Sequence, residues 1–338
     1  MEQARPGFPP TVSVLVTTFN HERFVHECLD SVLQQTFRDF ELIITDDASD
    51  DGTGDRIQAW LDRTGAPAQY VRNPRNRGLC ANRNRAIAMA RGRFICSLSG
   101  DDAYEPDRIE RQLTYLLGRP GAVAAVYSDA RMIDADGRTL HPSFLQYHLG
   151  DEPVPAPSGF FERVLLRGNY IPAPATMVRR EAFEQIGPYD ESLFYEDFQM
   201  WLKMGRRFRF EFLKGTLVLY RMLPDSMSRG PRTRRAMLET DSRILASWLG
   251  QCGTLNQALV NRLWALGGVQ LDHGFHVDAR LTLRTAAAAK PRLRRRLAAS
   301  LIRLPALTYV ASRVRQGGHL AQRARDAACR RLAGLHAR

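Results

Sequence analysis

The sequence lacks the motifs of several common enzyme classes. It has no HExxH or similar spacing among its scattered histidines, which argues against a zinc site. GxxxxGK[S/T] and GxGxxG are absent, so neither a P-loop nor a typical dinucleotide site is expected. A GxSxG turn for a serine nucleophile is also missing. These absences disfavour four enzyme classes: zinc hydrolases, P-loop enzymes, dinucleotide-dependent enzymes and serine hydrolases with a GxSxG turn.

Long apolar runs and paired cysteines are missing as well. The N-terminal residues contain no hydrophobic stretch of signal-peptide type. The most apolar window, 297–311, contains Arg303 and Pro305 and is too short for a bilayer. The five cysteines are an odd number without a CxxC pair, which indicates reduced thiols. We expect a cytoplasmic protein, either free or peripheral on the cytoplasmic face of the inner membrane.

Charge is distributed unevenly along the 338 residues. The formal net charge is +12, and residues 231–338 hold 20 basic side chains against 5 acidic ones. The length fits two domains, or one domain with an extension. We therefore predict a folded domain over 1–230 and a basic helical extension over 231–338. A basic extension favours polyanions such as anionic lipid, nucleic acid or an acidic partner.

Apolar runs alternate with helical periodicity in the first part of the chain. The runs predict strands at 12–20, 40–45, 69–73, 93–98 and 122–129. Helices are predicted from 24 to 33 and at 54–63, 80–91 and 106–118. Asn20 is expected to cap the first of them, and Gly92 to end the third. This alternation predicts an α/β fold with a mainly parallel, Rossmann-like sheet and helices on both faces.

The pattern changes in the second part of the chain. Residues 130–192 are looser, and their prolines indicate surface loops that line a site. A helix is predicted at 196–206 and a strand at 215–221. Further helices are predicted at 232–250, 255–273, 277–289 and, with interruptions, 291–335.

Three carboxylate clusters follow one another along the chain. Asp46–Asp47 and Asp101–Asp102 come directly after predicted strands, and Glu196–Asp197 opens a predicted helix. Ligands bind beyond the carboxyl ends of parallel strands, which makes the first two clusters candidates for a site. Each cluster also has a purely structural explanation, because Asp favours turns and acidic residues favour helix N-termini.

Each cluster also suits one task of an enzyme that holds a nucleotide and a metal and removes a proton. A carboxylate at Asp46–Asp47 can accept the imide N–H of uracil or hold ribose hydroxyls. Asp101–Asp102 can bind a hard divalent cation that also contacts phosphate oxygens. Glu196–Asp197 can deprotonate a sugar hydroxyl. Among the arginines of 73–92, Arg83 is the candidate for a diphosphate contact, because guanidinium groups bind phosphate oxygens in a fork.

Residues 12–228 resemble the catalytic domain of glycosyltransferase family 2, which has the GT-A fold. The matching segments are VSVLVTTFN, SVLQQTFRDFELIITDDASDDGT, NRGLCANRNRAIAMARG, LSGDD, SDARMID, ATMVRREAFEQIGPYDESL, YEDFQMWLKM and LYRMLPDSMS. They occur in the order of the family and cover about two-thirds of the chain. The resemblance implies an inverting, nucleotide-sugar-dependent catalytic domain over 1–230.

The resemblance implies specific roles in donor binding. Thr17 and Asp47 match positions that contact the base of the donor, and Asp46 lies beside them. Asp101 matches an acid that contacts the ribose or the metal. The glycine of the common DDGS turn is absent, because Ala48 stands in its place.

Metal and base positions follow from the same resemblance. Asp102 matches the ligand of Mg²⁺ or Mn²⁺ in the DXD-type motif, although Ser99 replaces the first acid of the fuller DxDD pattern. Asp197 matches the catalytic base, with Glu196 as the less favoured candidate. Residues 221–228 match the loop that closes over the donor. A histidine that is frequent in that loop is replaced by Leu223, which puts a metal or phosphate contact from the loop in doubt.

The implied function is transfer of a sugar, with UDP as the favoured nucleotide, to a saccharide or lipid-linked acceptor hydroxyl. Bacterial cell-surface polysaccharide or glycolipid synthesis is the implied setting. One alternative is a sugar-nucleotidyltransferase, which is disfavoured because a Gly-rich N-terminal loop is absent. A second is a polyanion-binding protein. Its basic tail has few aromatic residues for base stacking, so no nucleic acid partner is expected.

The basic tail leaves two interpretations open. Residues 293–304 place four leucines on one helical face and arginines around the others. Such a helix can lie on an anionic membrane surface, and we assign this role to 291–315. Alternatively, the extension packs on the catalytic domain as a helical cap with a basic outer face. The apolar pattern alone cannot distinguish lipid from protein as the partner of the helix.

Overall fold

The computed structural model describes residues 9–150, 160–227, 230 and 233–289. Its centre is one sheet of nine strands. The strands are β1 Val12–Thr18, β2 Phe40–Asp46, β3 Ala68–Arg72, β4 Phe94–Ser99, β5 Ala103–Tyr104, β6 Val123–Ile133, β7 Thr139–His141, β8 Thr176–Arg179 and β9 Arg209–Arg221. Their order is β3-β2-β1-β4-β8-β6-β9-β5, with β7 beside β6.

The sheet is parallel from β3 through β2 and β1 to β4, and again between β6 and β9. The strands β5, β7 and β8 pair antiparallel with their neighbours. The parallel part confirms the predicted Rossmann-like half of the fold. The antiparallel strands β5, β7 and β8 lie at 103–104, 139–141 and 176–179, where the sequence predicts no strands.

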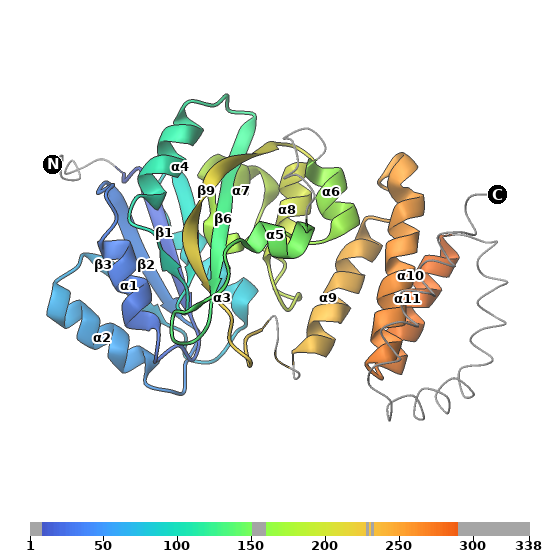
Figure 1. Ribbon diagram of the computed structural model, residues 1–338, viewed down its shortest axis with the longest axis horizontal. Helices are drawn as coiled ribbons and strands as arrows, with labels where there is room; N and C mark the ends of the chain where they lie inside the picture. Colours follow the sequence, from blue (N-terminus) through green and yellow to red (C-terminus); the bar gives the residue numbers. More distant parts are fainter. Residues whose placement is uncertain (1–8, 151–159, 228–229, 231–232, 290–338) are drawn as a thin grey trace.

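Helices cover both faces of the sheet, as predicted (Figure 1). Alternate residues of β1 face opposite sides, so Val14 and Val16 join one apolar cluster and Leu15 joins the other. The first cluster contains residues of α1 Val25–Leu33, α2 Thr53–Thr64 and α4 Arg108–Leu117. The second contains residues of α3 Leu79–Met89, α6 Phe160–Arg167, α7 Arg180–Ile186 and α8 Asp197–Gly205. A short helix, α5 Phe144–Leu149, contributes to both clusters.

Two of the predicted helix ends are wrong. Asn20 does not cap α1, which begins five residues later at Val25. Its backbone is left-handed with φ 58°, and its side chain donates to Asp50 at 2.7 Å. Gly92 does not end α3, because the helix stops at Met89.

The C-terminal helices pack on the α/β unit. They are α9 Arg234–Ser247, α10 Asn256–Asp272 and α11 His276–Ala288, which confirms the three helices predicted between 232 and 289. Ile244, Leu245, Leu259 and Leu263 are buried in the same apolar cluster as side chains of α6 and α8 (Figure 1). The cap interpretation therefore holds for this part of the extension. The predicted boundary at residue 230 falls between β9 and α9.

Several predictions fall on residues outside the described part. They are the surface loop around 151–159, the helices at 291–335 and the membrane-binding segment 291–315. Among the described residues, none of the helices combines the length and apolar character that crossing a bilayer requires. Cys28, Cys80, Cys96 and Cys252 are free and buried, as predicted for reduced thiols.

Gly92 is required by packing against β1. A Cβ atom there would lie 2.5 Å from the backbone nitrogen of Ser13 and 2.6 Å from the carbonyl carbon of Val12. We expect Gly92→Ala to lower the free energy of unfolding by about 1–3 kcal/mol, because the strand must shift. Gly121→Ala is the control, since nothing lies within 4 Å of its Cβ position. Denaturant midpoints measure both, and equal stability of the two variants would contradict the packing argument.

Candidate active site

The carboxyl ends of β1, β2 and β4 form one edge of the sheet, where the first two carboxylate clusters meet. The register pairs Thr18 of β1 with Asp46 of β2 and Thr17 with Ser99 of β4. Asp47 directly follows β2, and Asp101 and Asp102 follow β4 after a single glycine. The structure therefore brings these acids to the edge where parallel sheets bind ligands.

Asp46 is fully buried and shapes the turn after β2. Its carboxylate accepts hydrogen bonds from Thr18 Oγ1 at 3.2 Å and from the Ser49 hydroxyl. Arg72, its register partner on β3, places Nε 3.3 Å from Oδ2. Ala48 adopts φ 59°, a conformation that glycine reaches without strain.

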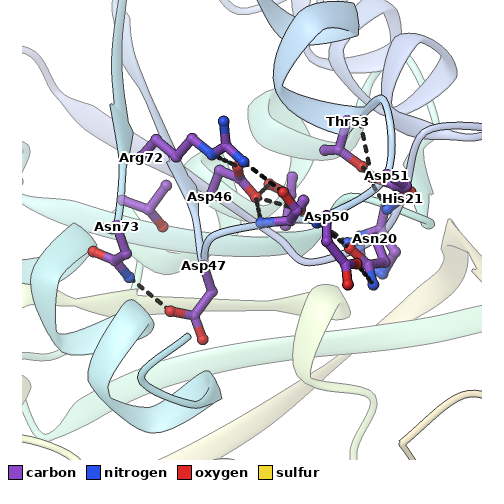
Figure 2. A network of polar contacts seen from close by, with 12 residues as sticks. Asn20, His21, Asp46, Asp47, Asp50, Asp51, Thr53, Arg72 and Asn73 are labelled. Atoms are coloured by element: carbon purple, nitrogen blue, oxygen red, sulfur yellow. Dashed lines mark hydrogen bonds and ion pairs between the residues drawn. The ribbon is translucent and has the colours of Figure 1, made fainter. Parts of the chain in front are cut away.

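Asp47 points away from Asp46 and holds the loop before α3 (Figure 2). Its Oδ1 accepts from Asn73 Nδ2 at 2.8 Å and from the Arg77 backbone N–H at 2.9 Å. Its Oδ2 accepts from the Gly78 backbone N–H at 2.8 Å. Asp47 therefore fixes the start of the helix that carries Arg83.

Arg221, the last residue of β9, locks the loop that carries Asp101 and Asp102. Its backbone N–H donates to Asp102 Oδ1, and its Nε donates to the carbonyl of Asp101, both at 2.8 Å. His21 Nε2 lies 3.7 Å from Asp101 Oδ1. Burial and the neighbouring charge of Asp101 raise the pKa of Asp102 well above its usual range. A bound cation would offset both effects.

Arg83 connects the strand edge to the third cluster. Its side chain is 4% exposed, and its Nη2 lies 3.1 Å from Thr17 Oγ1 and 3.5 Å from Glu196 Oε1. Its Nε is buried without a partner among the described residues. The positive charge of Arg83 lowers the pKa of both Asp102 and Asp197. The charge of Arg83 therefore acts on both Asp102, the candidate metal ligand, and Asp197, the candidate base.

Asp197 is the first residue of α8 and lies beside Glu196. Asn169 Nδ2 donates to Asp197 Oδ2 at 2.6 Å. Burial, reinforced by the neighbouring charge of Glu196, raises the pKa of Asp197 to about 7. Asn169 and Arg83 oppose this shift. A carboxyl group with such a pKa is suited to accept a proton near neutral pH.

A small cavity adjoins these residues. Its lining residues are Arg83, Ile95, Ser97, Ala173, Thr176, Val178, Phe183, Tyr189, Glu196, Asp197 and Trp201. Asp47 and Asp102 do not line it. Of the three acidic clusters, only Glu196–Asp197 lines this cavity, together with Arg83.

Two site residues were missed by sequence reasoning. Asn169 lies in a segment without periodicity, and no motif marks it as a donor to Asp197. His21 was one scattered histidine among eight and carried no ligand spacing. The side-chain contacts of these two residues are non-local, so a single sequence offers no signal for them.

Asp101 and Asp102 are the residues suited to hold a divalent cation. No group of three or more His, Cys, Asp or Glu side chains gathers around one point in the part of the chain that the structure describes. Mg²⁺ is usually held by one or two carboxylates together with substrate phosphates, rather than by an all-protein cage. Two adjacent hard oxygen donors and the raised pKa of Asp102 fit such a cation.

Sequence comparison identifies related proteins. The family model for glycosyl transferase family 2 matches residues 13–187. An uncharacterized glycosyltransferase, MJ1057 of Methanocaldococcus jannaschii, is 27% identical over 242 residues, covering 71% of this chain and 80% of that protein. The putative teichuronic acid biosynthesis glycosyltransferase TuaG of Bacillus subtilis is 27% identical over 223 residues, covering 66% of this chain and 83% of that protein.

Structure comparison finds the same fold in two glycosyltransferases. The mannosyltransferase PcManGT of Pyrobaculum calidifontis, in complex with GDP-Man and Mn²⁺, has a TM-score of 0.55 at 18% identity. The match covers 95% of this chain and 84% of that one. S. aureus TarS 1-349 with UDP-GlcNAc has a TM-score of 0.52 at 16% identity, covering 84% and 92%. With the family model matching more than half of its residues, the chain belongs to glycosyltransferase family 2 and is a glycosyltransferase.

Proposed function

We propose that this glycosyltransferase inverts the anomeric centre of a nucleoside-diphosphate sugar, with Asp197 as the base. The proton of an acceptor hydroxyl passes to Asp197, and the acceptor oxygen forms a bond to the anomeric carbon. The bond from that carbon to the diphosphate oxygen breaks, and the nucleoside diphosphate leaves. The observation that carries the proposal is a half-buried carboxylate, held by Asn169, whose pKa is raised to about 7.

Asp197 is a better base candidate than Glu196. Glu196 Oε1 lies 3.5 Å from Arg83, so its charge is engaged in a buried ion pair. Both acids line the cavity, but Asp197 has an amide partner on one oxygen and a pKa raised to about 7. We assign Glu196 the role of tuning Asp197 through its negative charge and of holding Arg83 in place.

Donor binding is assigned to the strand edge. A carboxylate offers about four acceptor positions, and three protein N–H groups contact Asp47, so one position remains for a base imide. Thr17, near the end of β1, is assigned to the same nucleotide base, Asp101 to the ribose and Arg83 to the diphosphate. Asp46 contributes indirectly by shaping the turn. PcManGT and TarS 1-349 were solved with GDP-Man and UDP-GlcNAc respectively, and we favour UDP for this chain.

A divalent cation belongs to this proposal. Asp102, with Asp101 beside it, would hold Mg²⁺ or Mn²⁺, and PcManGT was solved with Mn²⁺. Such a cation neutralises charge on a leaving diphosphate. Residues 221–227 are assigned to the loop over the donor. This range begins at Arg221, which contacts Asp101 and Asp102, and Ser228 lies outside the described residues.

The acceptor is assigned to a cell-surface saccharide or a lipid-linked saccharide. TuaG is named for teichuronic acid biosynthesis, and a chondroitin synthase of Pasteurella multocida is 32% identical over 131 residues. Work at the cytoplasmic face of the membrane suits a lipid-linked acceptor, and segment 291–315 is the proposed contact. The nucleotidyltransferase and polyanion-binding alternatives gain no support from family membership.

Replacement of Asp197 tests the base. We expect Asp197→Asn to lower turnover by roughly 10²–10⁴, because a positioned base contributes that much. Release of nucleoside diphosphate from a panel of UDP- and GDP-sugars, with and without a saccharide acceptor, measures turnover.

The folding control follows from the pKa of Asp197. That pKa is raised above its ordinary value of 3.8, so the contribution of Asp197 to stability is lost as pH rises through about 7. The variant should therefore unfold at or above the wild-type temperature at pH 8. A folded variant with wild-type turnover would refute the assignment.

The pH dependence tests the environment of that carboxylate. A base must be ionised, so wild-type turnover should rise with pH, reach half of its maximum at about 7 and level off at higher pH. Glu196→Gln removes the neighbouring negative charge and should move this rise to lower pH by roughly one unit. Thermal unfolding of the variant controls for folding. An unchanged profile, or a shift to higher pH, would show that Glu196 does not tune the base.

Nucleotide binding tests the metal acid. We expect Mn²⁺ to increase the thermal stabilisation of wild-type protein by UDP, because a cation held by Asp102 would neutralise charge on the diphosphate. Asp102→Asn should abolish the cation-dependent part and keep the remainder. The same measurement with GDP and dTDP identifies which nucleotide base the protein prefers. Cation-dependent stabilisation that survives in Asp102→Asn would place the metal elsewhere.

A further inference from the structure

The C-terminal helices contact both segments that surround Asp197. One segment, residues 192–198, carries the base and its chain neighbours. The other, residues 164–169, ends in Asn169, which donates to Asp197. Polar side chains of α9 and α10 reach the backbone or side chains of each segment. These contacts are directional, unlike the apolar packing that surrounds them.

Helix α9 holds the residues just before Glu196. The Phe194 backbone N–H donates to Thr240 Oγ1 at 3.1 Å. The Tyr195 hydroxyl donates to the Asp241 carboxylate. Arg243 donates to the backbone oxygen and the hydroxyl of Ser192, both at 2.7 Å. Three residues of one turn of α9 thus hold residues 192–195, which directly precede Glu196 and Asp197.

Helix α10 holds the other side through Arg262. Its guanidinium donates to the carbonyls of Val164, at 3.3 Å, and Leu165. Its Cζ lies 5.2 Å from the ring centroid of Phe198, the residue after Asp197. A Cβ atom on Gly168 would lie 3.0 Å from Arg262 Nη2. Gly168 directly precedes Asn169, so one side chain contacts the immediate neighbours of both the base and its amide partner.

Asp241 of α9 and Arg262 of α10 also interact electrostatically with each other. Burial raises the pKa of Asp241, while the Tyr195 hydroxyl and the charge of Arg262 lower it. Burial lowers the pKa of Arg262, and Asp241 opposes that shift. Removal of either partner leaves a poorly compensated charge beside the base segment, which is costly in a partly buried site.

We propose that Asp241 and Arg262 are positioning residues that hold Asp197 in its catalytic geometry. The helical extension is then a working part of the active site, in addition to any membrane contact made by later residues. This inference rests on the proposed role of Asp197. A displacement of about 1 Å at a catalytic group can cost roughly 10²-fold in rate.

The test uses full-length Asp241→Ala and Arg262→Met, assayed with the donor that turns over in the sugar-nucleotide panel. We expect kcat to fall about tenfold or more, while the KM for the donor stays within about twofold, because the strand edge is untouched. Deuterium uptake over residues 192–200 should rise in both variants. Asp241→Asn keeps an acceptor oxygen for Tyr195 and should recover most of kcat.

The control is Asp278→Ala. It removes an ion pair with Arg235, at 2.7 Å, that joins α11 to α9 away from the base. Wild-type kcat and uptake are expected. If either test variant fails to fold, Arg243→Gln replaces it, because this exposed side chain still contacts Ser192.

Two outcomes overturn the inference. The first is folded test variants with wild-type kcat and wild-type uptake over 192–200. The second is an equal loss of kcat in Asp278→Ala, which would indicate general destabilisation. An inactive Asp197→Asn combined with fully active Asp241→Ala and Arg262→Met refutes the inference alone. A fully active Asp197→Asn refutes the proposed function as well.

Discussion

The arrangement of the site depends on one buried cation, Arg83. Buried carboxylates are costly unless a positive charge or hydrogen bonds compensate them. Arg83 pairs with Glu196 and lowers the pKa of both Asp102 and Asp197. It lies on α3, the helix whose first turn is fixed by Asp47. The residue assigned to the donor base and the residue assigned to proton transfer are therefore linked through one helix and one charge.

Much of this geometry could be predicted because it follows from strand order. Acids that end neighbouring parallel strands must meet at one edge, and the β-branched run of β1 and the apolar run of β2 are easy to recognise. The position of these acids relative to the third cluster, Glu196–Asp197, was not predictable in the same way. It depends on α8 packing across the sheet, and on Asn169 in a segment without periodicity. Asn20 failed as a predicted cap because its side chain pairs across a turn 30 residues away.

The basic C-terminal part combines two properties that composition alone cannot separate. Its net charge suggested a polyanion, yet the apolar sides of α9 and α10 bury Ile244, Leu245 and Leu259 against the α/β unit. An amphipathic pattern specifies that one face leaves water, but not what covers it. The packed helices also carry arginines that contact the α/β unit, such as Arg243 and Arg262, so basic side chains take part in this packing.

A base with a raised pKa also explains why such packing is needed. As the proposed base, Asp197 has to be ionised near neutral pH although it is half-buried beside Glu196, and this ionisation opposes folding. The surrounding structure has to supply the compensating stability. Tyr195 and Phe198, which flank the acids, obtain it from Asp241 and Arg262 on helices that lie outside the sheet. Helices α9 and α10 thus hold the segments around Asp197 through contacts that lie outside the sheet.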